Sequence, residues 1–369
     1  MAKKEKPKYI ETINSINKHY DNNVIKMASE MPEVTKVRTS DLSLDYVLGG
    51  GFPISRIVEF LGDEHTGKTR DAYKIIEAFQ KTCVNCRKQD LKAEWSIKGG
   101  FPTATKMKCS CKNPKAAPMV IVDFEKTTDL EYMQTYFDID ISGIYIVVPE
   151  MPSQLVDIVE ALLRDPEIGL VLVDSIGMIS SDAEIDKAQK DIKMNEGARF
   201  MNMAVRKWQA ALNSNFNESN GQSLTSLLLI NRTYETLSLY SAQVPQGGRG
   251  LRHAKSITID RRIKERVKTK EGQIIGVHRM LKNLKNKAGF PYRVFTDYLY
   301  TDERDLNTYM KVNEKGQLID FALLFELIEI KGGWYYYGEN RFHGRAELEA
   351  KIYDTDLPEK VKQKIYEKD

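Results

Sequence analysis

The chain has 369 residues, of which 41% are hydrophobic and 29% are charged. These values are typical of a globular protein with one large domain and attachments, or with two to three domains, and they exclude a disordered or collagen-like chain. Its net charge is only +3, so the chain as a whole is not a polycation. No apolar run approaches the roughly 20 residues of a membrane-spanning helix, and the basic N-terminus leads into no signal region. We therefore expect a cytoplasmic protein without a membrane partner.

The N-terminal segment predicts an amphipathic helix. Its apolar residues Tyr9, Ile13, Ile16 and Tyr20 fall at i, i+4, i+7 and i+11, which places them on one face. This apolar stripe needs a surface to cover, and the residues alone favour packing on its own domain.

A phosphate-binding motif follows a predicted strand at residues 56–61. It fits the P-loop pattern G-x-x-x-x-G-K-[ST] at every required position and reads Gly62, Asp63, Glu64, His65, Thr66, Gly67, Lys68, Thr69. Apolar residues spaced along 75–79 predict that a helix follows. A strand that turns through glycines into a helix directs backbone N–H groups at a polyphosphate. We expect Lys68 to reach the β- and γ-phosphates of ATP and Thr69 to bind Mg²⁺.

Two short apolar runs, at residues 119–123 and 169–174, end in the carboxylates Asp123 and Asp174. Buried parallel strands commonly end this way at the edge where the P-loop opens. Asp174 is suited to hold Mg²⁺ through water, and Glu125 is placed to orient or deprotonate the attacking water.

Strands and helices alternate through this region. Residues 144–148 and 227–230 are predicted strands, and apolar spacing within 155–163 and 201–208 predicts helices with one buried face. This alternation predicts an α/β fold around a mostly parallel sheet.

An ordered series of residues over nearly the whole chain resembles the bacterial RecA recombinases. The series comprises Ser43 to Asp45; Gly49 to Gly51; Pro53; Arg56 to Glu59; the motif at 62–69; Val173 to Ser175; Ala183 to Ile185; Arg199 and Met201; Arg206 and Lys207; Ile230 and Asn231; Gly247 and Gly248; Lys285 to Lys287; Gly316 to Asp320; Leu327 to Glu329; and Gly332 to Tyr335. P-loops are widespread, whereas this ordered set is specific.

The resemblance implies an ATP-dependent helical filament on single-stranded DNA that pairs it with homologous duplex DNA and exchanges strands. It implies that Glu125 is the catalytic glutamate and that Asp129 and Tyr132 hold adenine, with Arg70 in the ATP site beside the motif. Lys285 and Lys287 match a pair that reaches the ATP of the neighbouring subunit. The N-terminal helix would dock on the next subunit, and mediator or single-strand-binding proteins are candidate partners.

The DNA-contacting loops of this family correspond to residues 184–196 and 232–248, for which we predict no regular structure. The predicted DNA-binding residues in and around them are Arg199, Arg206, Arg232, Gly247, Gly248 and Arg249. Residues 249–293 contain 14 Lys and Arg against three acids, an excess that suits phosphates, although charge alone slightly favours a solvated surface.

The first departure from the family is Arg232, which stands where the family has a glutamine that senses the γ-phosphate. An arginine can contact the γ-phosphate with a fixed charge, or it can face DNA. The sequence leaves both alternatives open, and with them the coupling of ATP to DNA binding.

The second departure is an insertion at residues 81–117, which holds all four cysteines of the chain as Cys83-x-x-Cys86 and Cys109-x-Cys111. Two close pairs of this kind predict tetrahedral Zn²⁺ ligation, as in a zinc ribbon; the alternative is four reduced, unliganded cysteines. The insertion carries nine Lys and Arg against two acids. We therefore hypothesise a metal-stabilised module that binds DNA or a partner.

The sequence thus predicts a RecA-like P-loop ATPase core at about residues 36–302, with an N-terminal oligomerisation segment (1–35) and a small α+β C-terminal domain (303–369). The predicted function is that of a DNA-dependent ATPase and recombinase in homologous recombination and repair. Two alternatives stay open: a RecA-like ring helicase or translocase, and a nucleotide-gated DNA-binding filament protein or regulator with little ATP turnover.

Overall fold

An eight-stranded sheet forms the centre of the computed structural model, which describes residues 7–20, 24–178, 196–235, 243–245 and 247–367. The strand order is β14-β13-β12-β3-β9-β8-β6-β7. Their bounds are β3 Ile57–Gly62, β6 Met119–Asp123, β7 Ile144–Val147, β8 Leu170–Asp174, β9 Ser226–Asn231, β12 Ile257–Lys268, β13 Ile274–Asn286 and β14 Val294–Tyr300. Neighbours from β12 to β7 are parallel, and β13 and β14 extend the sheet antiparallel. The prediction of a mostly parallel α/β fold is confirmed.

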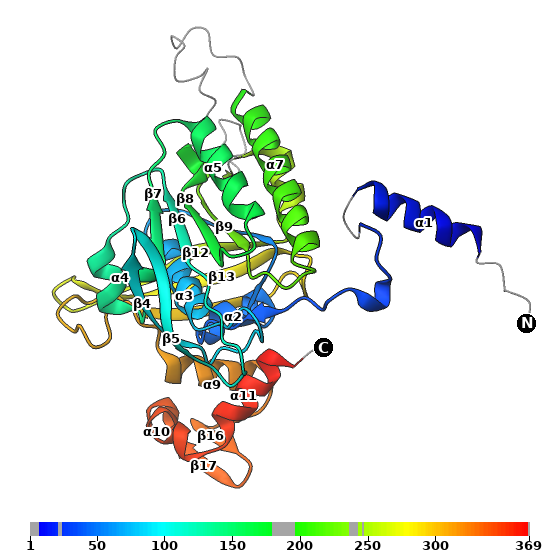
Figure 1. The fold of residues 1–369 in the computed structure, drawn as a ribbon. Coiled ribbons are helices and arrows are strands. Elements are labelled where there is room, and N and C mark those ends of the chain that lie inside the picture. The colour runs from blue at the N-terminus through cyan, green and yellow to red at the C-terminus, as the bar shows by residue number, and fades with distance from the viewer. Residues whose placement is uncertain (1–6, 21–23, 179–195, 236–242, 246, 368–369) are drawn as a thin grey trace, which may run out of the picture.

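Helices cover both faces of the sheet (Figure 1). The elements on these two faces are α2 Leu42–Leu48, α3 Lys68–Gln80, α4 Leu130–Tyr136, α5 Pro152–Arg164, α7 Glu196–Glu218 and α8 Gly248–Ala254. Alternate residues of one strand enter different cores: Ile121 packs in the cluster that holds α3, whereas Val120 and Val122 pack in the cluster that holds α5 and α7. Because successive side chains of a strand point to opposite faces, a continuous apolar run is required where both faces are covered.

The predicted stripe within 201–208 lies on α7 and is buried. Met201, Ala204, Val205 and Trp208 are at most 2% exposed, and the Trp208 indole N–H donates to the carbonyl of Val156 on α5. This stripe fixes α5 and α7 against the sheet.

The C-terminal part of the chain follows β14. It comprises α9 Glu314–Leu324, β15 Glu329–Lys331, β16 Trp334–Tyr337, β17 Asn340–His343, α10 Gly344–Lys351, η4 Ile352–Asp354 and α11 Leu357–Tyr366. The three strands form one antiparallel sheet. Phe321 of α9 stacks on Phe295 of β14 with ring centroids 3.9 Å apart, so this part shares the core.

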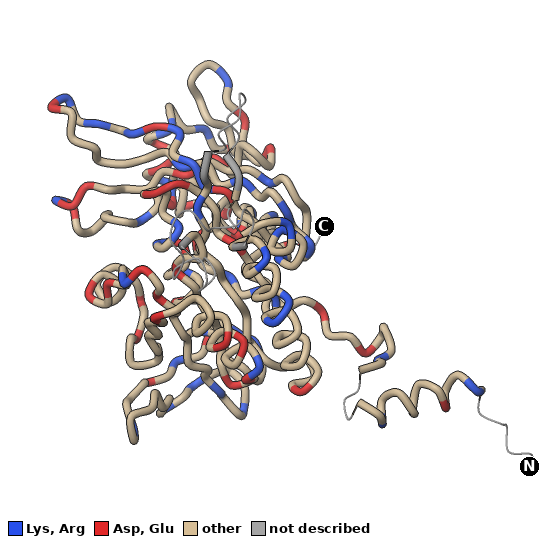
Figure 2. Tube along the Cα trace, turned by 90° about the horizontal axis from the view of Figure 1, so that it is seen from above, with Lys and Arg blue, Asp and Glu red and all other residues tan. Residues whose placement is uncertain are grey.

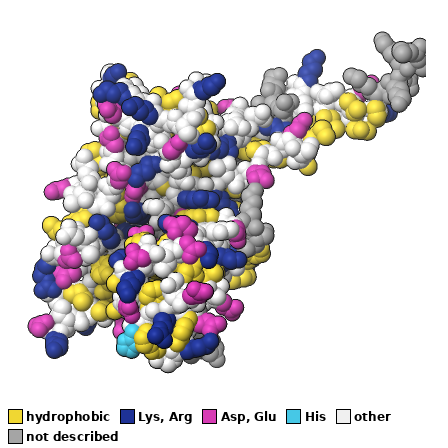
Figure 3. Space-filling model, turned by 90° about the horizontal axis from the view of Figure 1, so that it is seen from below, with side chains coloured by type: hydrophobic (Ala, Val, Ile, Leu, Met, Phe, Trp, Pro, Cys, Tyr) yellow, Lys and Arg dark blue, Asp and Glu magenta, His cyan; other side chains and the backbone are white. Residues whose placement is uncertain are grey.

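The N-terminal helix α1 spans Lys8–His19, as the spacing predicts, and extends away from the rest of the molecule (Figure 1). None of its residues is buried, and Tyr9 and Tyr20 are 64% and 60% exposed. Figure 3 shows hydrophobic side chains open along this extension. The apolar stripe therefore has no cover within the described chain. Two short elements link α1 to the core, η1 Ala28–Glu30 and β1 Lys36–Val37, and β1 pairs antiparallel with β2 Phe52–Pro53.

The cysteine-bearing insertion forms a hairpin of β4 Lys92–Lys98 and β5 Phe101–Lys108. It joins the end of α3 to the start of β6, so it is attached at the edge where the parallel strands begin, here called the amino edge. Trp95 packs on Gly143 of η2 (Ile141–Gly143), where a Cβ would overlap its ring. The remaining short elements are η3 Ile176–Met178, β10 Thr233–Glu235 and β11 Gln243–Pro245. Nowhere in the described ranges is a helix both long and apolar enough to span a bilayer.

Candidate nucleotide site

The predicted site residues converge at the edge where the parallel strands end, here called the carboxyl edge. Asp123 pairs with Asp174 in register across β6 and β8, and Leu61 pairs with Asn231 across β3 and β9. Because these strands are parallel, the P-loop after β3, Glu125 after β6 and Arg232 after β9 open at the same edge.

The P-loop turns sharply into α3. Gly67 adopts a left-handed conformation (φ +82°), and a Cβ there would overlap the Arg279 guanidinium, so glycine meets two requirements. The Lys68 ammonium donates to the carbonyls of Gly62 and Asp63 at 2.9 and 2.6 Å. Burial, with Arg261 and Arg232 nearby, lowers the pKa of Lys68 to about 8.

Thr69 and Asp174 form a pair suited to a divalent cation. The Thr69 hydroxyl donates to Asp174 Oδ2 at 3.1 Å. Burial raises the pKa of Asp174 to about 6, and the charges of Glu125 and Asp123 add to the rise. Hydroxyl and carboxylate oxygens are ligands that Mg²⁺ prefers, and a dication would offset this crowding of acids. The donor set therefore fits Mg²⁺.

Arg232 directs its guanidinium back to the P-loop. Nη1 donates to Glu64 Oε1 at 2.9 Å, and Nη2 donates to Glu125 Oε2 at 2.6 Å. The other carboxylate oxygen of Glu125 accepts from the Ser175 hydroxyl. Next to it, the Thr233 hydroxyl donates to Asp63 at 2.5 Å. Two acids of the P-loop thus hold the segment that leaves β9, and the arginine pairs with the candidate catalytic glutamate.

A cavity of about 700 Å³ lies beside the P-loop. It is lined by His65 to Arg70 and by the predicted adenine-binding residues Asp129 and Tyr132. Asp129 also caps α4, because its side chain accepts from the Tyr132 N–H at 2.9 Å. Its far wall was not foreseen from the sequence and includes Ile263, Arg266, Ile274, Val277, Leu299, Tyr309 and Met310. The pairing of β12, β13 and β14 brings the first five of these residues to the P-loop, and Tyr309 and Met310 follow β14, where the Met310 N–H donates to the carbonyl of Tyr300.

A buried ionic network lies directly behind the P-loop. Asp71 of α3 accepts from Arg70, Arg261 and Arg279, while Arg70 also bonds Asp41 at 2.5 Å. Arg279 bonds Asp297 at 2.6 Å. Three arginines thus balance three aspartates, and none of their side chains is more than 4% exposed. Arg70 lines the cavity, yet its guanidinium is held by this network, so it contributes to the wall more than to phosphate contact.

Lys285 and Lys287 lie far from the phosphate site of their own chain. Lys285 lies near the end of β13 and Lys287 follows that strand directly, both at the amino edge, where Lys285 pairs with Thr258 near the start of β12. Their ammonium groups donate to the carbonyls of Arg252 and His253 at the end of α8. Burial lowers the pKa of Lys285 to about 8, with Lys287 and Lys255 adding to the effect. Within one chain, these lysines do not complete the nucleotide site.

The predicted DNA-binding arginines sit on neighbouring helices. Arg199 and Arg206 are exposed on α7, and Arg249 is exposed on α8. Gly247 and Gly248 begin α8 with φ of +99° and +71°, so they serve the turn that starts this helix. Residues 184–195, 236–242 and 246 of the predicted loops lie outside the described residues. The prediction that 232–248 lacks regular structure is wrong at its ends, because β10 and β11 pair antiparallel there.

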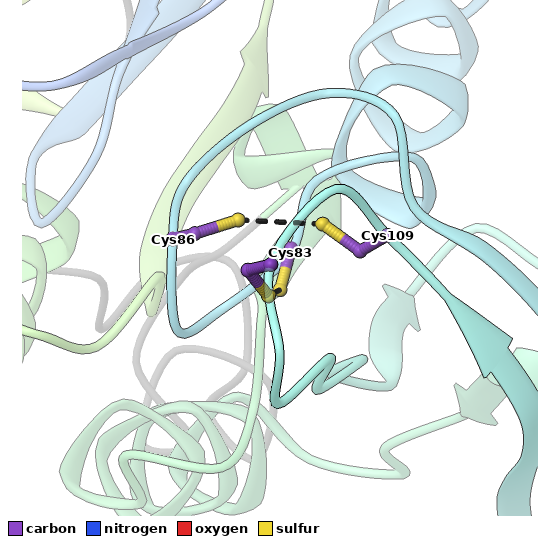
Figure 4. Close-up of side chains that lie close together, drawn as sticks. Cys83, Cys86 and Cys109 are labelled. Atoms are coloured by element: carbon purple, nitrogen blue, oxygen red, sulfur yellow. Dashed lines mark hydrogen bonds between the residues drawn. The ribbon is translucent and has the colours of Figure 1, made fainter.

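The four cysteines come together at the base of the β4–β5 hairpin, with all four sulfurs within 4.8 Å of one another. Cys86 and Cys109 face each other at 3.3 Å (Figure 4), and Cys83 lies 3.7 Å from Cys111. Tetrahedral Zn²⁺ with Zn–S bonds of about 2.3 Å requires sulfurs roughly 3.8 Å apart, so the spacing suits this metal. Burial raises the pKa of Cys83, but N–H groups including that of Lys115 outweigh it and lower the pKa to about 7.

Comparison with known proteins gives a consistent result. The family described as the RecA N-terminal domain matches residues 8–101 and 99–303. The chain is 28% identical to "Protein RecA" of Mycoplasmopsis pulmonis over 365 residues, which cover 97% of this chain and 93% of that protein. It is also 28% identical to "Protein RecA" of Staphylococcus aureus (strain JH9) over 342 residues, covering 91% of this chain and 84% of the relative.

Proposed function

Because this chain belongs to the RecA family, we propose that it is a DNA-dependent ATPase and recombinase, which assembles as a helical filament on single-stranded DNA and exchanges strands with homologous duplex DNA. The observation that carries this proposal is the convergence of Lys68, Thr69, Asp174, Glu125 and Arg232 at one edge of the sheet. We place its activity in the cytoplasm.

Each residue of the site has a role in this proposal. Lys68 and the P-loop N–H groups bind the phosphates, and Thr69 with Asp174 holds Mg²⁺, which supplies charge neutralisation when bound. Glu125 orients the attacking water and accepts its proton, while Ser175 fixes the carboxylate. Arg232 leaves Glu125 for the γ-phosphate, where its fixed charge stabilises the transition state and Glu125 becomes free to act.

Assembly supplies what one chain lacks. Lys285 and Lys287 lie at the amino edge, away from their own P-loop. We propose that they reach the nucleotide of the next subunit, so that hydrolysis depends on filament formation. The uncovered apolar stripe of α1 supports this arrangement, because a head-to-tail contact would bury it. Mediator or single-strand-binding proteins are candidate loading partners.

We propose further that Cys83, Cys86, Cys109 and Cys111 hold a structural Zn²⁺ ion. The hairpin β4–β5 is only two strands, and such a hairpin is marginally stable by itself. A closed site of four thiolates would fix both ends of this hairpin at one point.

Steady-state ATP hydrolysis with Mg²⁺, with and without single-stranded DNA, tests the proposed function. We expect strong stimulation by DNA that Lys68→Ala abolishes, together with strand exchange between a single strand and a homologous duplex. A wild-type protein that shows neither stimulated hydrolysis nor strand exchange would contradict the proposal.

One observation favours a second candidate. Arg232 and Ser175 engage both oxygens of Glu125, and a carboxylate held in this way is a poor base. A nucleotide-gated DNA-binding filament protein with little turnover would have this feature. ATP-dependent DNA binding without stimulated hydrolysis would identify it.

A further inference from the structure

The outer face of the inserted hairpin carries lysines that no carboxylate neutralises. Within the described part of the chain, Lys88, Lys92, Lys98, Lys108 and Lys112 are exposed, and their ammonium groups make no hydrogen bond or ion pair. The two acids of the insertion are already engaged: Glu94 pairs with Lys106 at 2.8 Å, and Asp90 accepts from the Cys109 thiol and the Ser110 N–H. Even with the charge of −2 on a zinc tetrathiolate, residues 81–117 keep a net excess of positive charge.

Two of these lysines oppose each other directly. Lys92 of β4 is the register partner of Lys108 of β5 at the base of the hairpin. Side chains at such positions lie about 4.5–5.5 Å apart at Cβ, and like charges there destabilise the pair. A hairpin that keeps this arrangement on its exposed face is suited to an anionic ligand.

The tip of the hairpin adds apolar surface beside the charge. Gly99 and Gly100 have φ of +59° and +86°, which matches the tight turn that joins two antiparallel strands. This turn leaves Ile97 and Phe101 60% and 66% exposed on either side of it. Lysines that contact phosphates, combined with an exposed ring that stacks on bases, are the usual elements of sequence-independent DNA binding.

The arm formed by residues 81–117 is fixed to the core rather than free to swing. The backbone N–H of Trp95 donates to Asp140 at 3.4 Å, and Arg87 donates to the Thr35 hydroxyl at 2.8 Å and to the carbonyl of Gly221. These contacts hold the arm at the amino edge, whereas the family's DNA loops leave β8 and β9 at the carboxyl edge. Lys and Arg positions also occur on other segments of the trace (Figure 2), and residues 249–293 hold 14 of them against three acids.

We propose that the basic face of this arm is a second DNA-binding surface, which holds the phosphate backbone of a DNA segment other than the strand bound at the carboxyl edge. This inference rests on the proposed function, because DNA is the polyanion on which that function acts. The occupant is inferred from charge complementarity, because the lysines of this face are positive and the phosphates of DNA are negative. The arm would thus bring a second strand or duplex to the opposite side of each subunit.

The test measures affinity of the full chain for a labelled single strand and for the matching duplex over a range of salt concentrations. Each phosphate contact contributes about 0.9 to the slope of log K against log salt on duplex DNA and about 0.7 on a single strand. The variant Lys92→Gln/Lys108→Gln should therefore lower the slope by about 1.8 on duplex or about 1.4 on single-stranded DNA. A second variant, Lys88→Gln/Lys112→Gln, probes the exposed lysines of the arm that neighbour the cysteines in sequence.

The matched control Lys207→Gln/Lys351→Gln removes the same two charges from lysines that each pair with a carboxylate at 2.7 Å. Its slope should stay closer to wild type than those of both arm variants. A reduction with duplex only, or with single strands only, identifies which DNA the arm holds. If both arm variants keep their zinc and show wild-type salt slopes on both DNAs, the inference is overturned. The basic face would then be assigned to an acidic protein partner instead of DNA.

Failure of this inference and failure of the proposed function give different results. Absence of DNA-stimulated ATP hydrolysis in the wild-type protein contradicts the function. If DNA stimulates hydrolysis by the wild-type protein but the arm variants keep its salt slopes, only the DNA-binding role of the arm is contradicted.

Discussion

Arg232→Ala is the substitution that most directly examines how this site works. In the described structure, its guanidinium pairs with Glu125, which is 15% exposed, and with Glu64, which is 67% exposed. If Arg232 moves to the γ-phosphate during hydrolysis, its removal takes away a preorganised charge at the reacting group. Such a donor is worth about 10²–10³ in kcat, or ~2.7–4 kcal/mol.

The ion pair between Arg232 and Glu64 indicates how much the substitution should change nucleotide affinity in the ground state. Exposed ion pairs such as Arg232–Glu64 contribute ~0–1 kcal/mol, which corresponds to a factor of about five at most. We therefore expect Arg232→Ala to lower kcat by about 100-fold or more. Its affinity for ADP, which lacks the γ-phosphate, should change by less than about fivefold.

Steady-state hydrolysis at saturating single-stranded DNA gives kcat, and equilibrium binding of ADP and of a slowly hydrolysed ATP analogue separates the γ-phosphate contact from general damage. Arg164→Gln is the matched control, because Arg164 is a half-exposed arginine that pairs with Glu160 on α5. Retention of kcat within about threefold, or an increase, would refute the assigned role. Equal losses of affinity for ADP and for the ATP analogue would indicate a structural effect instead.

Three further predictions concern the metal, the pH dependence of stability and assembly. If the four cysteines hold Zn²⁺ as proposed, Cys86→Ser should lose the ion and lower the melting temperature, since metal binding and folding of such sites are coupled. Metal analysis of the purified variant would contradict this if zinc stayed stoichiometric. Burial raises the pKa of Asp45 to about 7 in the folded chain against 3.8 for an ordinary aspartate, so the folded state binds the proton more tightly. Stability that this group contributes is present below pH 3.8 and is lost as pH rises toward 7, by up to on the order of 4 kcal/mol relative to Asp45→Asn. The free energy of unfolding, measured by denaturant titration, should therefore depend differently on pH in the wild type and in Asp45→Asn. Equal pH dependence in the two proteins would exclude this contribution. Ile13→Asp should abolish filament formation in light scattering while leaving the melting temperature unchanged, because no residue of α1 is buried in its own chain; filaments that persist would show that α1 is not the assembly contact.

Much of the fold follows from local patterns. The apolar runs that end in Asp123 and Asp174 are β6 and β8, and the stripe on 201–208 is buried on α7. These predictions succeed because strand and helix periodicity are properties of contiguous residues. The expectation of an irregular segment at 232–248 is wrong where β10 and β11 form, because the pairing of these two short segments with each other, and not local composition, decides such strands.

The features of the nucleotide site also divide into those that depend on local sequence and those that depend on long-range contacts. The sequence by itself determined the P-loop, the acids at the strand ends and the grouping of the cysteines, because each depends on residue types at fixed spacing along the chain. Only the tertiary structure decided that Arg232 meets Glu64 and Glu125, which are 168 and 107 residues away, and that three arginines balance three aspartates behind Gly67. It alone separated Lys285 and the inserted hairpin from the nucleotide edge. The physical reason is that long-range contacts depend on which strands become neighbours, and strand order is set by how all the apolar faces are buried together.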